Sequence, residues 1–133
     1  MARDITVKIG KDHYKTEIQV EQHNILADEP IDVGGTDLGP SPTEFLMSSV
    51  GTCKAITVRM YADRKNWELE AVRIRMSIGA QEGELQKTTF IKCHIELIGN
   101  LNETQRKRLL TIADKCPVHK ILINPIIIES NLM

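Results

Sequence analysis

A long segment of apolar and small residues in the middle of the chain limits the folds that it can adopt. From about Thr43 to Asn66, apolar residues recur at spacings of three and four, as on one face of an α-helix. Such a helix would be about 36 Å long at 1.5 Å per residue. Lys54 is the only charge between Glu44 and Arg59, so we expect the first half of the helix to be buried almost all round.

Specific positions define the start and the inner face of this helix. Ser41 or Thr43 would cap its N-terminus, with Pro42 in the first turn. A glycine inside a helix costs about 1 kcal/mol relative to alanine, so Gly51 is expected to permit a close crossing with another helix. The inner stripe is predicted to contain Leu46, Val50, Cys53, Thr57, Met60 and Tyr61.

The segments on either side of the helix alternate with period two, which is typical of β-strands. Before the helix, three short runs within the first 30 residues predict an antiparallel meander with one wet face. Residues 30–42 are rich in Gly and Pro, so they are expected to form an irregular loop, and loops of this length are often functional.

After the helix, residues 72–78 and 91–97 predict a β-hairpin with a turn at 82–84. A second helix is expected at 103–115, with Leu109, Leu110, Ile112 and Ala113 facing inward, and a last strand near 125–129. The order βββ-α-ββ-α-α-β predicts an α+β fold with antiparallel sheets packed around a long central helix.

The length and charge of the chain exclude several classes of protein. A chain of 133 residues fits a single domain, residues 1–133, with a core of its own. Seventeen basic and 18 acidic residues, with no basic run, make nucleic acid an unexpected partner. No apolar stretch is long enough to span a membrane and no signal peptide is recognisable, so we predict a cytoplasmic protein. Paired cysteines in that compartment are more often catalytic or metal-binding than structural.

Cys116 precedes a proline that is placed to start a helix. It would therefore be the N-cap of a short helix, where unpaired amides and the helix dipole favour an anion and lower the pKa of a thiol. His119 and Lys120 would add positive charge in the first turn. The alternative is a buried cysteine that acts as a small apolar side chain.

Cys53 lies on the inner stripe of the central helix, where a cysteine is usually part of the core. Lys54 and Arg59 could favour a thiolate there, and Cys93, on a predicted strand, is expected to be structural. Three cysteines suit one working pair plus a spectator, so the first hypothesis is a Cys53–Cys116 dithiol with redox chemistry. Cys116-x-x-His119 is half of a zinc signature, but no second Cys/His pair accompanies it, and we expect neither metal nor cofactor.

Three motifs together resemble the OsmC/Ohr family of thiol peroxidases: residues 34–46 (GGTDLGPSPTEFL), the small-residue helix around Cys53, and Cys116-Pro-Val-His119. The resemblance covers nearly the whole chain in element order. It implies an intertwined homodimer with its sites at the subunit interface. Cys53 would reduce an organic hydroperoxide or hydrogen peroxide and become a sulfenic acid, and Cys116 would resolve it as a disulfide. A dithiol reductant, such as a lipoyl-bearing protein, would then reset the enzyme.

The chain departs from the family where the peroxidases carry an arginine and its carboxylate partner. Before Arg59 the chain has only Arg3, close to the terminus, and Lys11 is the nearest cation to the arginine position. Thr43 stands at the carboxylate position, with Glu44 beside it.

Glu44 precedes Cys53 by nine residues, about 2.5 helical turns, so the two lie on opposite helix faces. Glu44 would thus serve a site built from other segments, or act only as a first-turn acid. The segment 23–28 (HNILAD) is similar to uncharacterised OsmC-like proteins. The competing functions are a non-catalytic redox sensor or small-ligand-binding dimer, and a purely structural dimer whose cysteines are too far apart to bridge.

Overall fold

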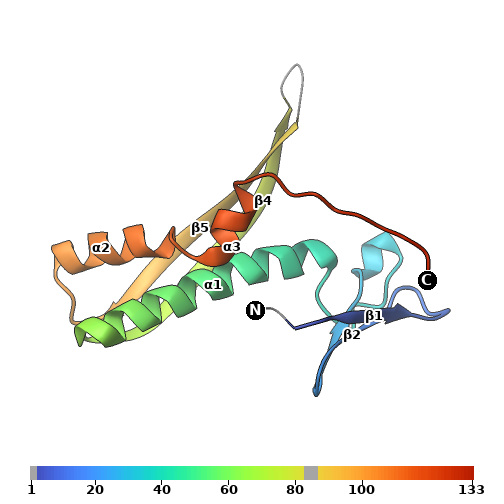
Figure 1. Cartoon of the computed structure of the whole chain (residues 1–133), viewed down its shortest axis with the longest axis horizontal. Helices are drawn as coiled ribbons and strands as arrows, with labels where there is room; N and C mark the ends of the chain where they lie inside the picture. The colour runs from blue at the N-terminus through green and yellow to red at the C-terminus, as the bar shows by residue number, and fades with distance from the viewer. Residues whose placement is uncertain (1–2, 83–86) are drawn as a thin grey trace. The chain divides into compact units, whose positions relative to one another are not determined.

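The computed structural model describes residues 3–82 and 87–133, and the chain forms two compact units, Met1–Leu46 and Met47–Met133 (Figure 1). Over these residues its elements are three strands, one 3₁₀ turn, a long helix, a two-stranded hairpin and two further helices. The α+β class with antiparallel sheets is therefore confirmed.

The first unit contains a three-stranded antiparallel sheet of β1 (Thr6–Ile9), β2 (Thr16–Val20) and β3 (His23–Ala27), in that order. This is the predicted meander. The loop that follows was expected to have no regular structure, but it contains one 3₁₀ turn, η1 (Ile31–Val33). Pro30 precedes this turn with φ −62°, and Gly34 ends it at φ 94°, a left-handed conformation that glycine adopts without strain.

Asp28 organises the same loop from the end of β3. It is only 2% exposed, and its carboxylate accepts hydrogen bonds from the backbone N–H groups of Tyr14, Glu29, Thr36 and Leu38 and from the Thr36 hydroxyl at 2.6 Å. These bonds, the Thr36 hydroxyl first among them, hold the pKa of this carboxyl far below its usual range. Much of the loop is thus folded around one buried carboxylate.

Helix α1 (Pro42–Lys65) begins at a capping box, which confirms Ser41 as its cap. Its N-terminal bonds are reciprocal: Ser41 N–H donates to Glu44 Oε1 at 2.8 Å, and Glu44 N–H donates to Ser41 Oγ at 3.3 Å. Such a cap stabilises a helix by about 1 kcal/mol. The α1 boundaries agree with the predicted range to within one residue.

The buried stripe of α1 differs from the predicted one. Its members are Val50, Gly51, Lys54, Val58 and Ala62. Leu46 and Met60, which we expected on the inner face, are 41% and 62% exposed. The prediction that the first half of this helix is buried almost all round is therefore wrong for the single chain. The buried face differs from the predicted one because Lys54 lies on it. Its ammonium can be buried there because His119, Asp114 and the Ala113 carbonyl accept its hydrogen bonds.

The second unit packs α1 against a hairpin of β4 (Leu69–Glu82) and β5 (Lys87–Gly99), whose register pairs Met76 with Cys93. This is the predicted hairpin, although residues 83 and 84 of its expected turn lie outside the described residues. Met76 also lies over Gly51 of α1. In the single chain, the absence of a side chain at Gly51 makes room for Met76 of β4. A close crossing of α1 with another helix at Gly51 stays a prediction.

Helix α2 (Glu103–Ala113) starts at the predicted capping box of Asn102 and Gln105. Arg106 ties this helix to the end of β5, because its guanidinium donates to three backbone carbonyls between residues 97 and 101. Figure 1 shows α2 beside α1, with the short helix α3 (Pro117–Leu122) over the middle of α1. The core of this unit is Val58, Ala62, Leu69, Leu101, Leu109 and Ala113.

Two expectations for the C-terminal region are wrong. Leu109 is fully buried, which stabilises the fold by about 2 kcal/mol, but Leu110 is 54% exposed on the other side of α2. The strand expected near 125–129 is absent, and Ile127 and Ile128 are each 85% exposed. A strand needs a hydrogen-bonding neighbour, and none of the described strands pairs with this segment.

Across the residues that the structure describes, no helix combines the length and the apolar character needed to cross a membrane.

Candidate dithiol site

Cys116 is the N-cap of α3, as predicted. Its backbone is extended (φ −67°, ψ 144°), Pro117 occupies the first turn, and the Cys116 Sγ accepts a hydrogen bond from His119 N–H at 3.3 Å. The side chain is fully buried. The cap geometry therefore fixes the position of this sulfur and shields it from water.

Cys53 lies in the middle of α1, and its side chain is half-buried. Its thiol lies close enough to the Cys116 thiol to raise the pKa of that group. The two cysteines that were singled out from the sequence are thus neighbours in the second unit, although 62 residues separate them in the chain. Cys93 is also half-buried and free, on β5 opposite Met76.

The pKa of the Cys116 thiol is raised, not lowered as we expected from its cap position. Burial is the main cause, because the charged form loses its water. The His119 N–H bond and the nearby Lys54 charge act in the opposite direction, while Cys53 raises the pKa further. A cap on a helix of only six residues does not outweigh full burial. Cys116 therefore holds its proton, and the more accessible Cys53 is the better placed of the two to meet a reagent.

Lys54 belongs to this site, although the sequence indicated it only as a charge near Cys53. Its ammonium lies 2.8 Å from His119 Nδ1, 3.0 Å from Asp114 Oδ1 and 3.3 Å from the carbonyl oxygen of Ala113. The residue is only 3% exposed. A lone charge on an otherwise apolar helix is the sequence signal that points to it. Asp114 carried no such signal, because it ends α2 as an ordinary polar residue.

The other predicted supporting residues belong to the first unit. Glu44 closes the α1 capping box, and its bonds with Ser41 lower the pKa of its carboxyl, which supports its interpretation as a first-turn acid. Thr43 and Lys11 are exposed. Arg3 forms an ion pair with Glu21 at 3.0 Å. A role of Lys11, Thr43 or Glu44 toward the thiols stays a prediction.

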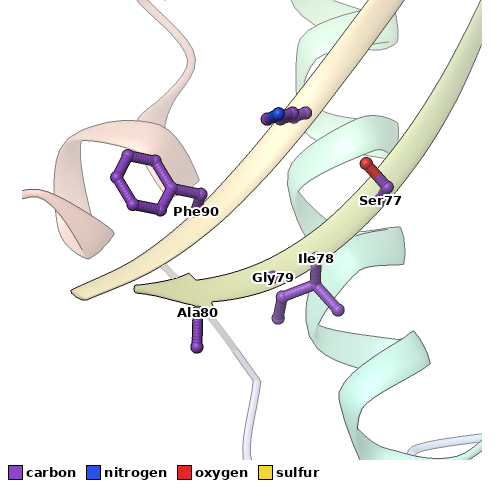
Figure 2. Close-up of a pocket in the computed structure, with 6 residues that line it drawn as sticks. Ser77, Ile78, Gly79, Ala80 and Phe90 are labelled. Atoms are coloured by element: carbon purple, nitrogen blue, oxygen red, sulfur yellow. The ribbon is translucent and has the colours of Figure 1, made fainter. Parts of the chain in front are cut away.

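Two open hollows lie on the β4–β5 hairpin. One, of about 470 Å³, is lined by Ser77, Ile78, Gly79, Ala80, Phe90 and Lys92, and Figure 2 shows Phe90 and Ile78 extending from the two strands. The other, of about 530 Å³, is lined by residues 73, 75 and 94–96. Neither lining includes Cys53 or Cys116, so these hollows are separate from the dithiol.

Within residues 3–82 and 87–133, no three His, Cys, Asp or Glu side chains are grouped as metal ligands would be. His119 Nδ1 instead accepts from Lys54, because an ammonium can only donate.

Comparisons with known proteins identify the family and the fold. The family model described as OsmC-like protein matches residues 35–131. No curated protein matches the chain. Among solved structures, an OsmC-like protein from Mycoplasma pneumoniae is 20% identical over 92% of this chain and 88% of its own, with a TM-score of 0.73.

Two further structures share the fold. An organic hydroperoxide resistance protein OsmC from Legionella pneumophila is 18% identical over 92% of this chain and 90% of its own, with a TM-score of 0.67. An OsmC-like protein of unknown function from Vibrio cholerae is 10% identical over 91% of this chain and 93% of its own, with a TM-score of 0.72. On the family match over most of its length, this chain belongs to the OsmC-like protein family.

Proposed function

We propose that this protein is a cysteine-based thiol peroxidase that reduces organic hydroperoxides or hydrogen peroxide. The observation that carries the proposal is the proximity of the half-buried Cys53 thiol to the fully buried Cys116 thiol, whose pKa it raises. One sulfur is accessible to a reagent and the other is held beside it under a helix cap, which is the arrangement that a two-step dithiol cycle needs.

In the first step the Cys53 thiolate attacks the distal oxygen of the hydroperoxide. The S–O bond forms, the O–O bond breaks, and the alkoxide leaves with the peroxide's proton as an alcohol; from hydrogen peroxide the product is water. Cys53 is oxidised to a sulfenate, which takes up a proton to become sulfenic acid.

In the second step the Cys116 sulfur attacks the Cys53 sulfenic acid. The S–S bond forms, the S–O bond breaks, and the departing hydroxide takes the Cys116 proton to give water. A dithiol reductant, of the lipoyl type, then returns the disulfide to two thiols by exchange. The sum is hydroperoxide plus dithiol giving alcohol, water and disulfide.

The family supports this proposal, as does the similarity in fold to the Legionella protein, an organic hydroperoxide resistance protein. We further propose that the single OsmC-like domain works as a homodimer in the reducing cytoplasm. Large apolar side chains exposed in the single chain, such as Val7 at 62% and Ile128 at 85%, are surfaces that a second copy would cover.

The test is to follow cumene hydroperoxide with the purified protein and excess dithiothreitol. We expect catalytic consumption of many equivalents per protein, proportional to protein concentration, because each disulfide formed is reduced again. Consumption that stops after one equivalent, or never exceeds the rate with dithiothreitol alone, would contradict a peroxidase.

The second candidate is a non-catalytic redox-sensing or small-ligand-binding dimer. One observation favours it: Arg3, the only arginine before Arg59, is already paired with Glu21. If Lys11 cannot replace a peroxide-binding arginine, because a lysine lacks the guanidinium fork, oxidation would be slow and stoichiometric. The same assay separates the two functions, since a sensor forms the disulfide once without turnover.

A further inference from the structure

The buried ammonium of Lys54 has an arrangement that the two-thiol cycle alone does not explain. Lys54 is 3% exposed, and burying a charged ammonium is costly unless partners compensate it. Its three N–H groups are matched by three acceptors, His119 Nδ1, Asp114 Oδ1 and the Ala113 carbonyl, at 2.8 to 3.3 Å. The site therefore holds a positive charge in a fixed position.

The imidazole of His119 accepts this bond on Nδ1, which places its proton on Nε2. The same residue donates its backbone N–H to the Cys116 sulfur at 3.3 Å. His119 is thus a link between the ammonium and the capped thiol. Among the described residues, the groups that act on the pKa of Cys116 are the Cys53 thiol and the Lys54 ammonium from α1 and the His119 amide from α3.

Each passage through the dithiol cycle places negative charge on the Cys116 sulfur. The charge forms when Cys116 gives up its proton in order to attack the Cys53 sulfenic acid. It develops again when an external dithiol breaks the disulfide, because the reductant reaches the half-buried Cys53 and not the fully buried Cys116, so Cys116 is the sulfur that leaves. Exchange is faster when the leaving sulfur is a better-stabilised thiolate.

We propose that Lys54, held by His119 and Asp114, is a positioning residue that stabilises the Cys116 thiolate as it attacks and as it leaves. This inference rests on the proposed function, because it assumes that a Cys53–Cys116 bridge forms and is reduced in the cycle. Lys54 acts through the Cys116 sulfur and does not contact the peroxide. Asp114 offsets part of the Lys54 charge, so the stabilisation of the Cys116 thiolate depends on both residues.

The test uses the disulfide formed by diamide, which involves no peroxide. The full-length protein is oxidised, diamide is removed, and reduction by dithiothreitol is followed by acid quench and intact mass. In Lys54→Met we expect reduction roughly threefold to tenfold slower at neutral pH, with the rate rising only at higher pH, because the leaving thiolate loses its cation. Asp114, 65% exposed, and His119, 30% exposed, remain hydrated in this variant, so it should fold. Lys107→Met, an exposed lysine on α2, is the matched control and should leave the rate unchanged.

A second variant tests the opposite sign and does not depend on the folding of Lys54→Met. Asp114→Asn keeps an acceptor for Lys54 and removes the countercharge, so reduction should be about twofold faster. A purely structural ion pair would lower the melting temperature in both variants without moving the rates in opposite directions, and that result would overturn the inference. Failure of diamide to form the 53–116 bridge would overturn it as well. If the diamide disulfide shows the predicted shifts but peroxide does not form it, the proposed peroxidase fails and the role of Lys54 stands.

Discussion

Replacing Cys53 by serine is expected to abolish hydroperoxide consumption. The serine hydroxyl is neither ionised at neutral pH nor able to accept the peroxide oxygen as a stable sulfenic acid, so no cycle can begin. The rate should fall more than about 1000-fold, to that of dithiothreitol alone. The measurement is cumene hydroperoxide loss at several protein concentrations.

Cys93→Ser is the matched control for this prediction. Cys93 is also free and half-buried, but it lies on β5 and pairs across the hairpin with Met76. It should keep nearly full activity. Equal losses in the two variants would show that the loss is not specific to Cys53, and a Cys53→Ser protein that still turns over would show that Cys53 is not the nucleophile.

Replacing Cys116 by serine is expected to separate the two steps. Cys53 still reduces the first equivalent of hydroperoxide, but the sulfenic acid has lost the thiol that is held beside it. Turnover then depends on dithiothreitol from solution and should fall about tenfold to 100-fold, because an oriented intramolecular partner is replaced by a diffusing one. Intact mass should show Cys53 gaining first one and then two oxygen atoms as peroxide is added.

The wild-type protein gives the control for the same step. Because burial and Cys53 raise the pKa of the Cys116 thiol, its thiolate fraction grows with pH throughout the neutral range. Disulfide formation should therefore accelerate steadily with pH in the wild type. A Cys116→Ser protein that turns over at the wild-type rate, or a resolution rate that is flat from pH 6 to 8, would show that Cys116 is not the resolving thiol.

Local patterns were sufficient to predict most elements of the fold. The meander, the hairpin and the starts of two helices follow from period-two alternation and from capping residues such as Ser41 and Asn102, because these signals act over a few neighbouring positions. The last strand failed for the opposite reason. Residues 125–129 have the composition of a strand, but a strand depends on a partner that composition does not specify.

The two thiols of the candidate site could be predicted from the sequence, but the groups that surround them could not. Cys116 could be placed as an N-cap because Pro117 follows it directly. The direction of its pKa could not be predicted, since full burial is a property of the packed unit and opposes the cap. Lys54 was predicted only as a charge that could favour a thiolate at Cys53, but it lies on the buried face of α1, where Asp114, 60 positions later, accepts its hydrogen bond.

The account depends most on the formation of a bond between Cys53 and Cys116. The direct test is to give the reduced protein one equivalent of cumene hydroperoxide, block remaining thiols, and determine the intact mass and the bridged peptides. The account predicts a loss of two hydrogen atoms per chain, with a single cross-link between the peptides that contain Cys53 and Cys116, and Cys93 alkylated. A stable sulfenic or sulfinic acid at Cys53 with Cys116 alkylated, or a bridge that involves Cys93, would contradict it.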